Sequence, residues 1–396
     1  MFSTKLNAKA GRGSLILCLL LYVPLWGQSG EFDAFEEAEA NAFADFQEQE
    51  DQAYADFMEA EAEAFAQFRQ EVEALWGDYD APTVHEWIEY SEDKRARTEV
   101  NLEEGVATVE VLVEEGTDPT ESLRSAVETL AVDRGKSADY AVPLPDGSVV
   151  QPQPLSDNPV LADQLQLPSG ESVTAANVVA FAKDVVDQAG ALIERVVGGD
   201  GKARTKATVS VQLVPDHVKK RAEPYLGLVR TYAQRYGLEV SLVFALMQTE
   251  SSFNPKARSS APAFGLMQLV PTSGGRAAYE YVYKESKVLP PNYFYDPEQN
   301  IELGCAYLAF VREAYFDKVT DPQNTEYCIV ASYNTGAGNV SKVFTGGTYV
   351  KKAIPLINQR SPEQLYNHLR TNLPYEETRL YIEKIQARKP LYEAWN

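Results

Sequence analysis

Aromatic residues recur at a spacing of 11 along residues 32–79, and this repeat is the strongest constraint that the sequence places on the fold. The two interleaved series are Phe32, Phe43, Tyr54, Phe65 and Trp76, and Phe35, Phe46, Phe57, Phe68 and Tyr79. Mostly Ala, Glu and Gln lie between them, and these residues favour helix. Because 11 residues make three turns of about 3.67 residues, both series fall on one nearly straight stripe. The pattern predicts a single long helix over residues 30–80 with an acidic face opposite the stripe.

An aromatic stripe of this length must be buried against an apolar surface. Three surfaces are compatible with the sequence: the protein's own body, a partner protein, or a second copy in a right-handed coiled coil. A short "GDYDAP" turn joins the helix directly to the next module. We therefore expect the stripe to pack against that module, and we expect the protein to be a monomer.

The charge of the chain is unevenly distributed. The formal net charge is −22, and residues 31–76 hold 15 Asp and Glu against one Arg, a net charge of −14. Residues 216–396 hold 21 Lys and Arg against 18 Asp and Glu, a net charge of +3. So acidic a chain is a poor ligand for nucleic acid, which we exclude as a partner, whereas its C-terminal part would not repel an anionic polymer.

The first residues have the features of an export signal. Lys5, Lys9 and Arg12 precede the apolar run "SLILCLLLYVPLW", and the small residues of "GQSG" follow it. The run is shorter than the roughly 20 residues of a membrane-spanning helix. We expect residues 1–29 to be a cleaved signal peptide. Lipid attachment at Cys18 is disfavoured because Leu17 stands where a lipidation signal needs a small residue, although membrane attachment stays open.

Residues 81–215 have the alternating strand and helix patterns of an α+β domain. The expected elements are two strands (98–105 and 106–116), a helix (119–132), a second helix (172–197) and a final strand (206–215). Six prolines within residues 141–170 indicate an irregular loop. From residue 216 to the C-terminus the patterns are helical, so the sequence predicts an α+β accessory domain followed by a mainly α domain over 216–396.

Tyrosine is concentrated in the helical domain, which has 17 of the 22 tyrosines. A flat apolar ring with a polar tip suits a groove that binds sugars, although helical cores also use tyrosine. Cys305 and Cys328 lie in apolar contexts that fit either a disulfide or two buried thiols. The three histidines are scattered, so we expect no metal site and no cofactor.

Glu250 is a lone carboxylate at the end of the apolar stretch "FALMQTESSFNPKA". On a helix it shares a face with Val243, Leu246 and Met247, so we expect it to be partly buried. Burial raises the pKa of a carboxyl group towards the range that a general acid needs. The alternative is a structural glutamate paired with a Lys or Arg. Another acid, Asp296, precedes Pro297 and is expected to be only a helix N-cap.

Five segments of the helical domain occur in a characteristic order. They are "ALMQTESSFNPKARSS", "FGLMQLVPTS", "FYDPEQNIELGCAYL", "ASYNTGAGNV" and "LPYEETRLYI". Together they resemble the catalytic domain of the family 1 lytic transglycosylases, which has a lysozyme-like fold. The aromatic helix and the "LWGDYDAPTVHEWIEYSEDKRAR" segment resemble the N-terminal accessory domain of the membrane-bound lytic murein transglycosylase C family. The resemblance implies a periplasmic enzyme whose partners are peptidoglycan glycan strands.

The resemblance also implies roles for individual residues. Glu250 corresponds to the single catalytic acid and base of the family. The residues implied in substrate binding are Ser251, Met267, Gln268, Tyr333, Asn334 and Tyr381. The Ser251 hydroxyl fits either a role that steadies the carboxylate or only a local hydrogen bond at the helix end. The Tyr333 phenol is expected to orient the carboxylate. For Met267 an apolar wall of the site and simple core filling are equally compatible with the sequence.

A single acid fits substrate-assisted cleavage, in which the acetamido group of the sugar does the work of a second carboxylate. By resemblance, Glu250 would protonate the bond between N-acetylmuramic acid and N-acetylglucosamine and then deprotonate the muramyl 6-hydroxyl, leaving a 1,6-anhydro end. Two alternatives stay open. A goose-type-lysozyme-like muramidase would need a second acid near Glu250, and a non-catalytic wall-binding or scaffold protein would need no acid at all.

Overall fold

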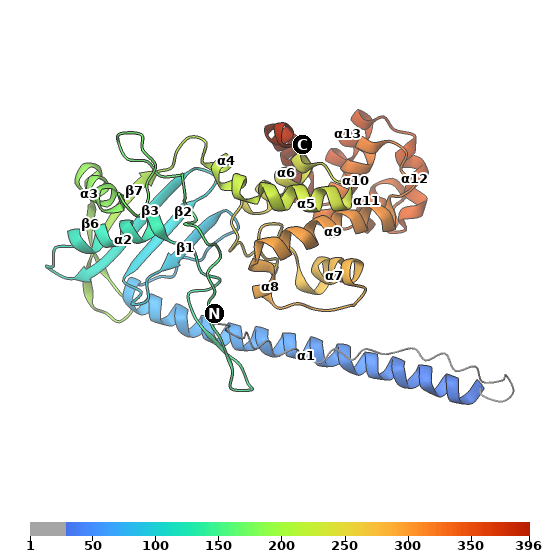
Figure 1. Cartoon of the computed structure of the whole chain (residues 1–396), viewed down its shortest axis with the longest axis horizontal. Helices are drawn as coiled ribbons and strands as arrows, with labels where there is room; N and C mark the ends of the chain where they lie inside the picture. The colour runs from blue at the N-terminus through green and yellow to red at the C-terminus, as the bar shows by residue number, and fades with distance from the viewer. Residues whose placement is uncertain (1–28) are drawn as a thin grey trace, which may run out of the picture. The chain divides into compact units, whose positions relative to one another are not determined.

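A computed structural model of the chain describes residues 29–396, so the predicted signal peptide lies outside the described residues. The chain divides into two compact units, residues 1–48 and 49–396. Helix α1 (Ser29–Trp76) covers the aromatic repeat, as predicted, but it ends at Trp76 and leaves Tyr79 in the following turn (Figure 1). Within residues 29–396 no helix has both the length and the apolar character needed to cross a membrane.

The accessory domain is built on a five-stranded antiparallel sheet with the strand order β1-β2-β3-β7-β6. The strands are β1 (Glu86–Tyr90), β2 (Ala96–Asn101), β3 (Val106–Glu114), β6 (Leu192–Val197) and β7 (Ala203–Gln212). A two-stranded hairpin of β4 (Val142–Pro143) and β5 (Val149–Val150) lies in the proline-rich loop. Two helices, α2 (Thr120–Val132) and α3 (Val178–Ala189), complete the domain. This confirms the predicted α+β character.

The predicted helix over residues 172–197 is wrong in its second half. Helix α3 ends at Ala189, and Gly190 follows with a positive φ of 67° that a side chain would disfavour. Residues Leu192–Val197 then pair with β7 as the edge strand β6. The segment is rich in β-branched and other apolar residues, so strand pairing, which periodicity does not reveal, decides its conformation. Strand β1 was also absent from the prediction.

The two faces of the sheet are covered by different elements. Val109 and Val111 of β3 share one face and pack in a core with residues of α2 and α3. Leu112 points to the opposite face, where it packs with Phe68 and Trp76 of α1. The C-terminal part of the aromatic stripe therefore lies on the protein's own sheet, as predicted.

The rest of the chain is mainly helical, which confirms the predicted fold class. Its helices are α4 (His217–Ala222), α5 (Leu226–Tyr236), α6 (Val240–Ser251), α7 (Arg276–Tyr283), α8 (Pro291–Tyr295), α9 (Pro297–Tyr315), α10 (Pro322–Thr335), α11 (Ala337–Thr345), α12 (Val350–Asn358), α13 (Pro362–Asn372) and α14 (Glu376–Arg388). The Asp296 side chain accepts a hydrogen bond from the Gln299 backbone N–H, so Asp296 is the N-cap of α9, as predicted.

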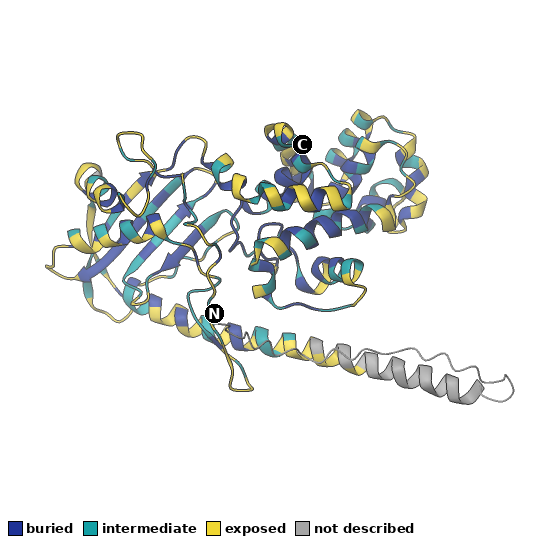
Figure 2. Cartoon of the chain, in the orientation of Figure 1, coloured by how far each residue is buried: buried dark blue, intermediate teal, exposed yellow. Residues whose placement is uncertain are grey.

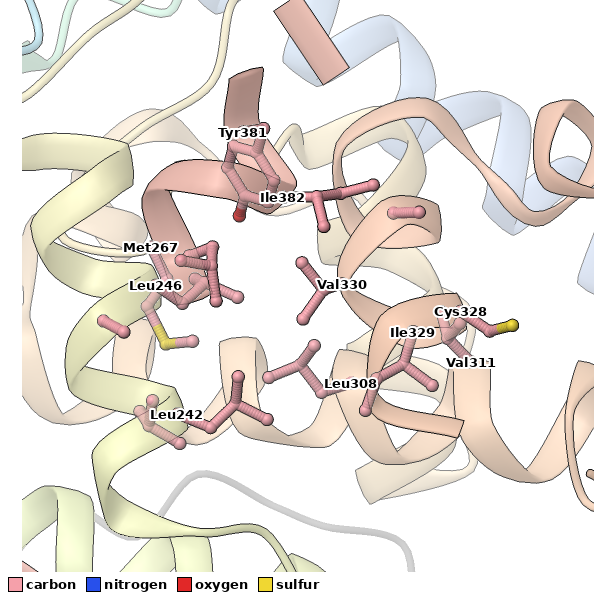
Figure 3. Packing of buried hydrophobic residues seen from close by; sticks show 14 of the residues in the cluster. Leu242, Leu246, Met267, Leu308, Val311, Cys328, Ile329, Val330, Tyr381 and Ile382 are labelled. Atoms are coloured by element: carbon pink, nitrogen blue, oxygen red, sulfur yellow. The ribbon is translucent and has the colours of Figure 1, made fainter. Parts of the chain in front are cut away.

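The core of the helical part is formed around α6. Buried residues run through α6 and α9 (Figure 2). Cys305 and Cys328 are free thiols within this core, so the disulfide alternative is wrong. Figure 3 shows part of the packing, with Leu246 and Met267 close to Leu308 and Val330. A helix that is apolar on all sides is fixed in position, and α6 therefore holds its C-terminal residues firmly.

Candidate active site

Glu250 is in the last turn of α6, where the helix emerges from the core into a cavity of about 410 Å³. Gln268, Tyr333, Asn334 and Tyr381 line the same cavity, so the structure brings together five of the seven predicted site residues. Ser251 and Met267 do not line it. The cavity walls come from α6, α10, α14, the loop after α6 and the segment that precedes β1.

The carboxyl group of Glu250 is set up to hold a proton. Burial raises its pKa to about 8, and the negative charge of Glu377 acts in the same direction. The Tyr381 hydroxyl donates a hydrogen bond of 2.6 Å to Oε1 of Glu250, which lowers the pKa. The effect of burial on the pKa is larger than the effect of this hydrogen bond. At neutral pH Glu250 is therefore mostly protonated and can act as a general acid.

Tyr381, and not Tyr333, orients the carboxyl group. The Tyr333 hydroxyl donates to the backbone carbonyl of Met267 at 2.6 Å, so the predicted orienting role of Tyr333 is wrong. Tyr333 is still close enough to Glu250 for the carboxylate charge to add to the effect of burial, which raises the pKa of the phenol. Asn334 follows it on α10, and its Oδ1 accepts a hydrogen bond of 2.6 Å from Thr378 of α14.

Ser251 acts on the backbone and not on the carboxylate. Its buried hydroxyl lies 3.1 Å from the carbonyl oxygen of Met247 and 2.8 Å from that of Leu266. The second contact joins the end of α6 to the turn formed by residues 264–269. Of the two alternatives for Ser251, the local hydrogen bond is correct, and Ser251 positions one wall of the cavity relative to Glu250.

Met267 is a core residue. Its side chain is fully buried, next to Leu246 in Figure 3, and it has no surface in the cavity. Of the two alternatives that the sequence left open, core filling is correct. The contribution of Met267 to the site is its backbone, which accepts the hydrogen bond from Tyr333 and donates one of 2.8 Å to Oδ1 of Asn300.

Gln268 is held by the same turn. Its backbone has a φ of 48°, and its Nε2 donates to the carbonyl oxygens of Ala257 and Gly265 at 3.0 and 2.9 Å. Among the described residues its Oε1 has no hydrogen-bond partner. The amide nitrogen is therefore used by the protein, and the amide oxygen is buried.

The sequence analysis missed several residues that shape the site. Asn300 of α9 is fully buried and bonds the backbone at Phe264, Met267 and Phe294. An amide within the apolar run "NIELGCAYL" was the signal that could have revealed it. Other residues that were not predicted line the cavity, among them Val84 and His85 of the accessory domain and Glu377, Leu380 and Lys384 of α14.

Comparison with known families covers most of the described chain. Residues 227–353 match the family model described as Transglycosylase SLT domain. Residues 49–224 match that described as Membrane-bound lytic murein transglycosylase C, N-terminal domain. A relative named membrane-bound lytic murein transglycosylase C, from Sodalis glossinidius, is 35% identical over 324 residues, which cover 79% of this chain and 85% of the relative. The chain belongs to the membrane-bound lytic murein transglycosylase C family.

Another member of the family, from Pectobacterium atrosepticum, is 34% identical over 81% of this chain and 87% of its own length. The 70 kDa soluble lytic transglycosylase of Escherichia coli matches 46% of this chain and 26% of its own, at 23% identity and a TM-score of 0.34. Membership confirms the predicted resemblance of both domains. Tyr381 lies beyond the segment matched by the SLT family model, and the structure shows its contact with Glu250.

Proposed function

We propose that this protein is a lytic transglycosylase, a lyase that cleaves the β-1,4 bond between N-acetylmuramic acid and N-acetylglucosamine in peptidoglycan and forms 1,6-anhydro-N-acetylmuramic acid. The observation that carries the proposal is the setting of Glu250: burial raises its pKa to about 8, Tyr381 bonds its carboxyl group, and five predicted site residues line the cavity around it. The names of the relatives support the substrate class.

The proposed reaction uses Glu250 twice. Its carboxyl group first gives a proton to the glycosidic oxygen as the bond to C1 breaks, and the acetamido group of the muramyl residue stabilises the developing cation. The resulting carboxylate accepts the hydrogen bond from Tyr381 and is stabilised until it takes a proton back. It then removes the proton of the 6-hydroxyl, whose oxygen bonds to C1. Gln268 and Asn334 line the cavity in which the sugar would bind.

Glu377 gives a specific reason to keep a muramidase as the second candidate. Its carboxylate lines the same cavity and raises the pKa of Glu250 through its charge. A second carboxylate of this kind could activate water, which would make the reaction a hydrolysis with a reducing end as product. No feature of the described residues favours the third alternative, a non-catalytic scaffold.

The product of digestion decides between the two reactions. We expect the enzyme to release muropeptides that end in 1,6-anhydro-N-acetylmuramic acid, each lighter by one water than a muramidase product, as measured by mass spectrometry of digested peptidoglycan. Glu250→Gln should lose activity by about 100- to 10,000-fold, because the amide cannot transfer the proton. Glu377→Gln should keep the anhydro product. Reducing ends from the wild type would establish the hydrolase, and an active Glu250→Gln variant would refute both mechanisms.

We also propose that the protein acts in the periplasm as a monomer, with its leader removed near Ser29. The basic and apolar pattern of residues 1–28 supports export, and packing of the C-terminal part of the stripe on the accessory sheet supports the monomer. Mass spectrometry of the mature N-terminus and light scattering of the purified protein test these points. A diacylated Cys18 would instead establish attachment to the membrane.

A further inference from the structure

The accessory domain contributes a wall of the catalytic cavity. Val84 and His85, which precede β1, line it together with Glu250, although more than 160 residues separate them in the chain. The Nδ1 atom of His85 lies 3.0 Å from the hydroxyl oxygen of Ser252, two residues after Glu250. This contact fixes the ring against the turn that ends α6, and 27% of the side chain stays exposed.

Helix α14 gives the cavity a gradient of charge. Glu377, Leu380, Tyr381 and Lys384 all line it and follow the three- and four-residue spacing of one helical face. The carboxylate of Glu377 acts on Glu250. Lys384 is seven residues further along, or about 10 Å at 1.5 Å per residue. The acidic part of the cavity is therefore at the reacting bond, and the basic part is about two helical turns away.

The ammonium group of Lys384 is available to a ligand. It is exposed, and among residues 51–396 no carboxylate forms an ion pair with it. Its charge, with that of Arg388, adds to the effect of burial in lowering the pKa of His85, so Lys384 is close to the ring. Glu103 is an opposing charge: its carboxylate lies 3.9 Å from His85 and forms an ion pair of 2.8 Å with Arg388, and the positive charge of Lys384 also helps to lower the pKa of Glu103. The charge of Glu86 also raises the pKa of His85, but by less than the charge of Glu103 does.

We propose that Lys384, beside the wall formed by Val84 and His85, is a subsite for a carboxylate on the muramyl 3-O substituent. This inference rests on the function proposed above. The rings of the glycan carry hydroxyl and acetamido groups but no charge. The carboxylates of the substrate are those of the lactyl group in peptide-free strands and those of the peptide stem in substituted strands. A cation in this cavity therefore recognises the substituent and not the sugar backbone, through a charge-assisted hydrogen bond.

The test compares Lys384→Gln with the wild type on three substrates: stem-bearing glycan strands, the same strands with their carboxylates amidated, and peptide-free strands. On stem-bearing or peptide-free strands we expect KM to rise about tenfold with little change in kcat. The reason is that the contact removed by the substitution stabilises the ground state and the transition state equally. On amidated strands the variant and the wild type should not differ. A KM effect confined to stem-bearing strands identifies the stem as the ligand, and an effect that persists on peptide-free strands identifies the lactyl carboxylate.

Two controls make the outcome specific. Lys351→Gln removes an exposed lysine of α12 outside the cavity and should leave KM unchanged on every substrate. Lys384→Arg keeps the charge and should restore most of the binding. An equal rise in KM on amidated strands, or no rise on either charged substrate, would overturn the subsite. Products without anhydro ends from the wild type would instead refute the proposed function, so the two failures are distinguishable.

Discussion

Tyr381 and Glu377 act on the same carboxyl group in opposite directions. The Tyr381 hydroxyl donates to Glu250, which favours the ionised form and lowers the pKa. The negative charge of Glu377 disfavours the ionised form of Glu250 and raises the pKa of Glu250. Burial is the largest effect, and it places the pKa of Glu250 at about 8. The carboxyl group can therefore both release and take up a proton near neutral pH.

The pH dependence of kcat/KM follows from these effects. A general acid is active only while protonated, so we expect activity to fall as the pH rises through about 8, the pKa of Glu250. Tyr381→Phe removes the bond that favours ionisation and should move this decline to higher pH. Glu377→Gln removes the opposing charge and should move it to lower pH. Shifts in the same direction for both variants would contradict the assignment of the declining limb to Glu250.

At the scale of an element, the turn of residues 264–269 is the part of the site that tolerates least change. Gly265 has a φ of 75°, and a Cβ at this position would overlap the carbonyl oxygen of Phe294 and the Asn300 side chain. The same turn includes the Leu266 carbonyl, which accepts a hydrogen bond from Ser251. It also includes Gln268, which lines the cavity. Its backbone conformation therefore links the core to the site.

Gly265→Ala should lower the free energy of unfolding by at least about 1–3 kcal/mol, because the overlap with buried backbone adds to the strain of a positive φ. Activity should fall as Gln268 moves. Gly147→Ala is the matched control, since Gly147 has a φ of 84° but open space around the added Cβ. Urea unfolding of the two variants separates strain from overlap. Equal losses in both would show that the close approach at Gly265 has no energetic importance.

At the scale of the whole molecule, charged side chains that are buried between the two domains hold the turn after Glu250. Lys256 is buried with its Nζ 3.7 Å from Glu89 and 3.4 Å from Asp139 of the accessory domain. Arg221 is also buried and donates to the Ser252 carbonyl at 2.8 Å and to Gln164 at 2.8 Å. The accessory domain therefore supports the turn after Glu250 as well as lining the cavity around it.

Lys256→Met should destabilise the full-length protein by about 3–5 kcal/mol, because it leaves the carboxylates of Glu89 and Asp139 buried without their cation. Adding Glu89→Gln and Asp139→Asn to this variant should recover most of the loss, since no uncompensated charge then remains. Equilibrium unfolding in urea measures both changes. A triple variant no more stable than Lys256→Met would mean that packing, and not charge, explains the effect.

The sequence by itself determined the features that depend on neighbours along the chain. The 11-residue repeat predicted α1, because helical periodicity converts spacing directly into a face. The apolar run before Glu250 predicted a buried acid with a raised pKa, and the order of the motifs predicted the family. These are properties of a single helix or of short segments.

The tertiary structure decided every feature that depends on residues distant in the chain. Pairing with β7 made Leu192–Val197 a strand where the local pattern indicated helix. Of the two tyrosines that line the cavity, packing of α14 on α6 brings Tyr381 into contact with Glu250. The contact between the two domains brings His85 to the same cavity. Periodicity and propensity predict which face of a helix or strand is buried. They do not predict which side chains of two different elements form a hydrogen bond, because that depends on how the elements pack.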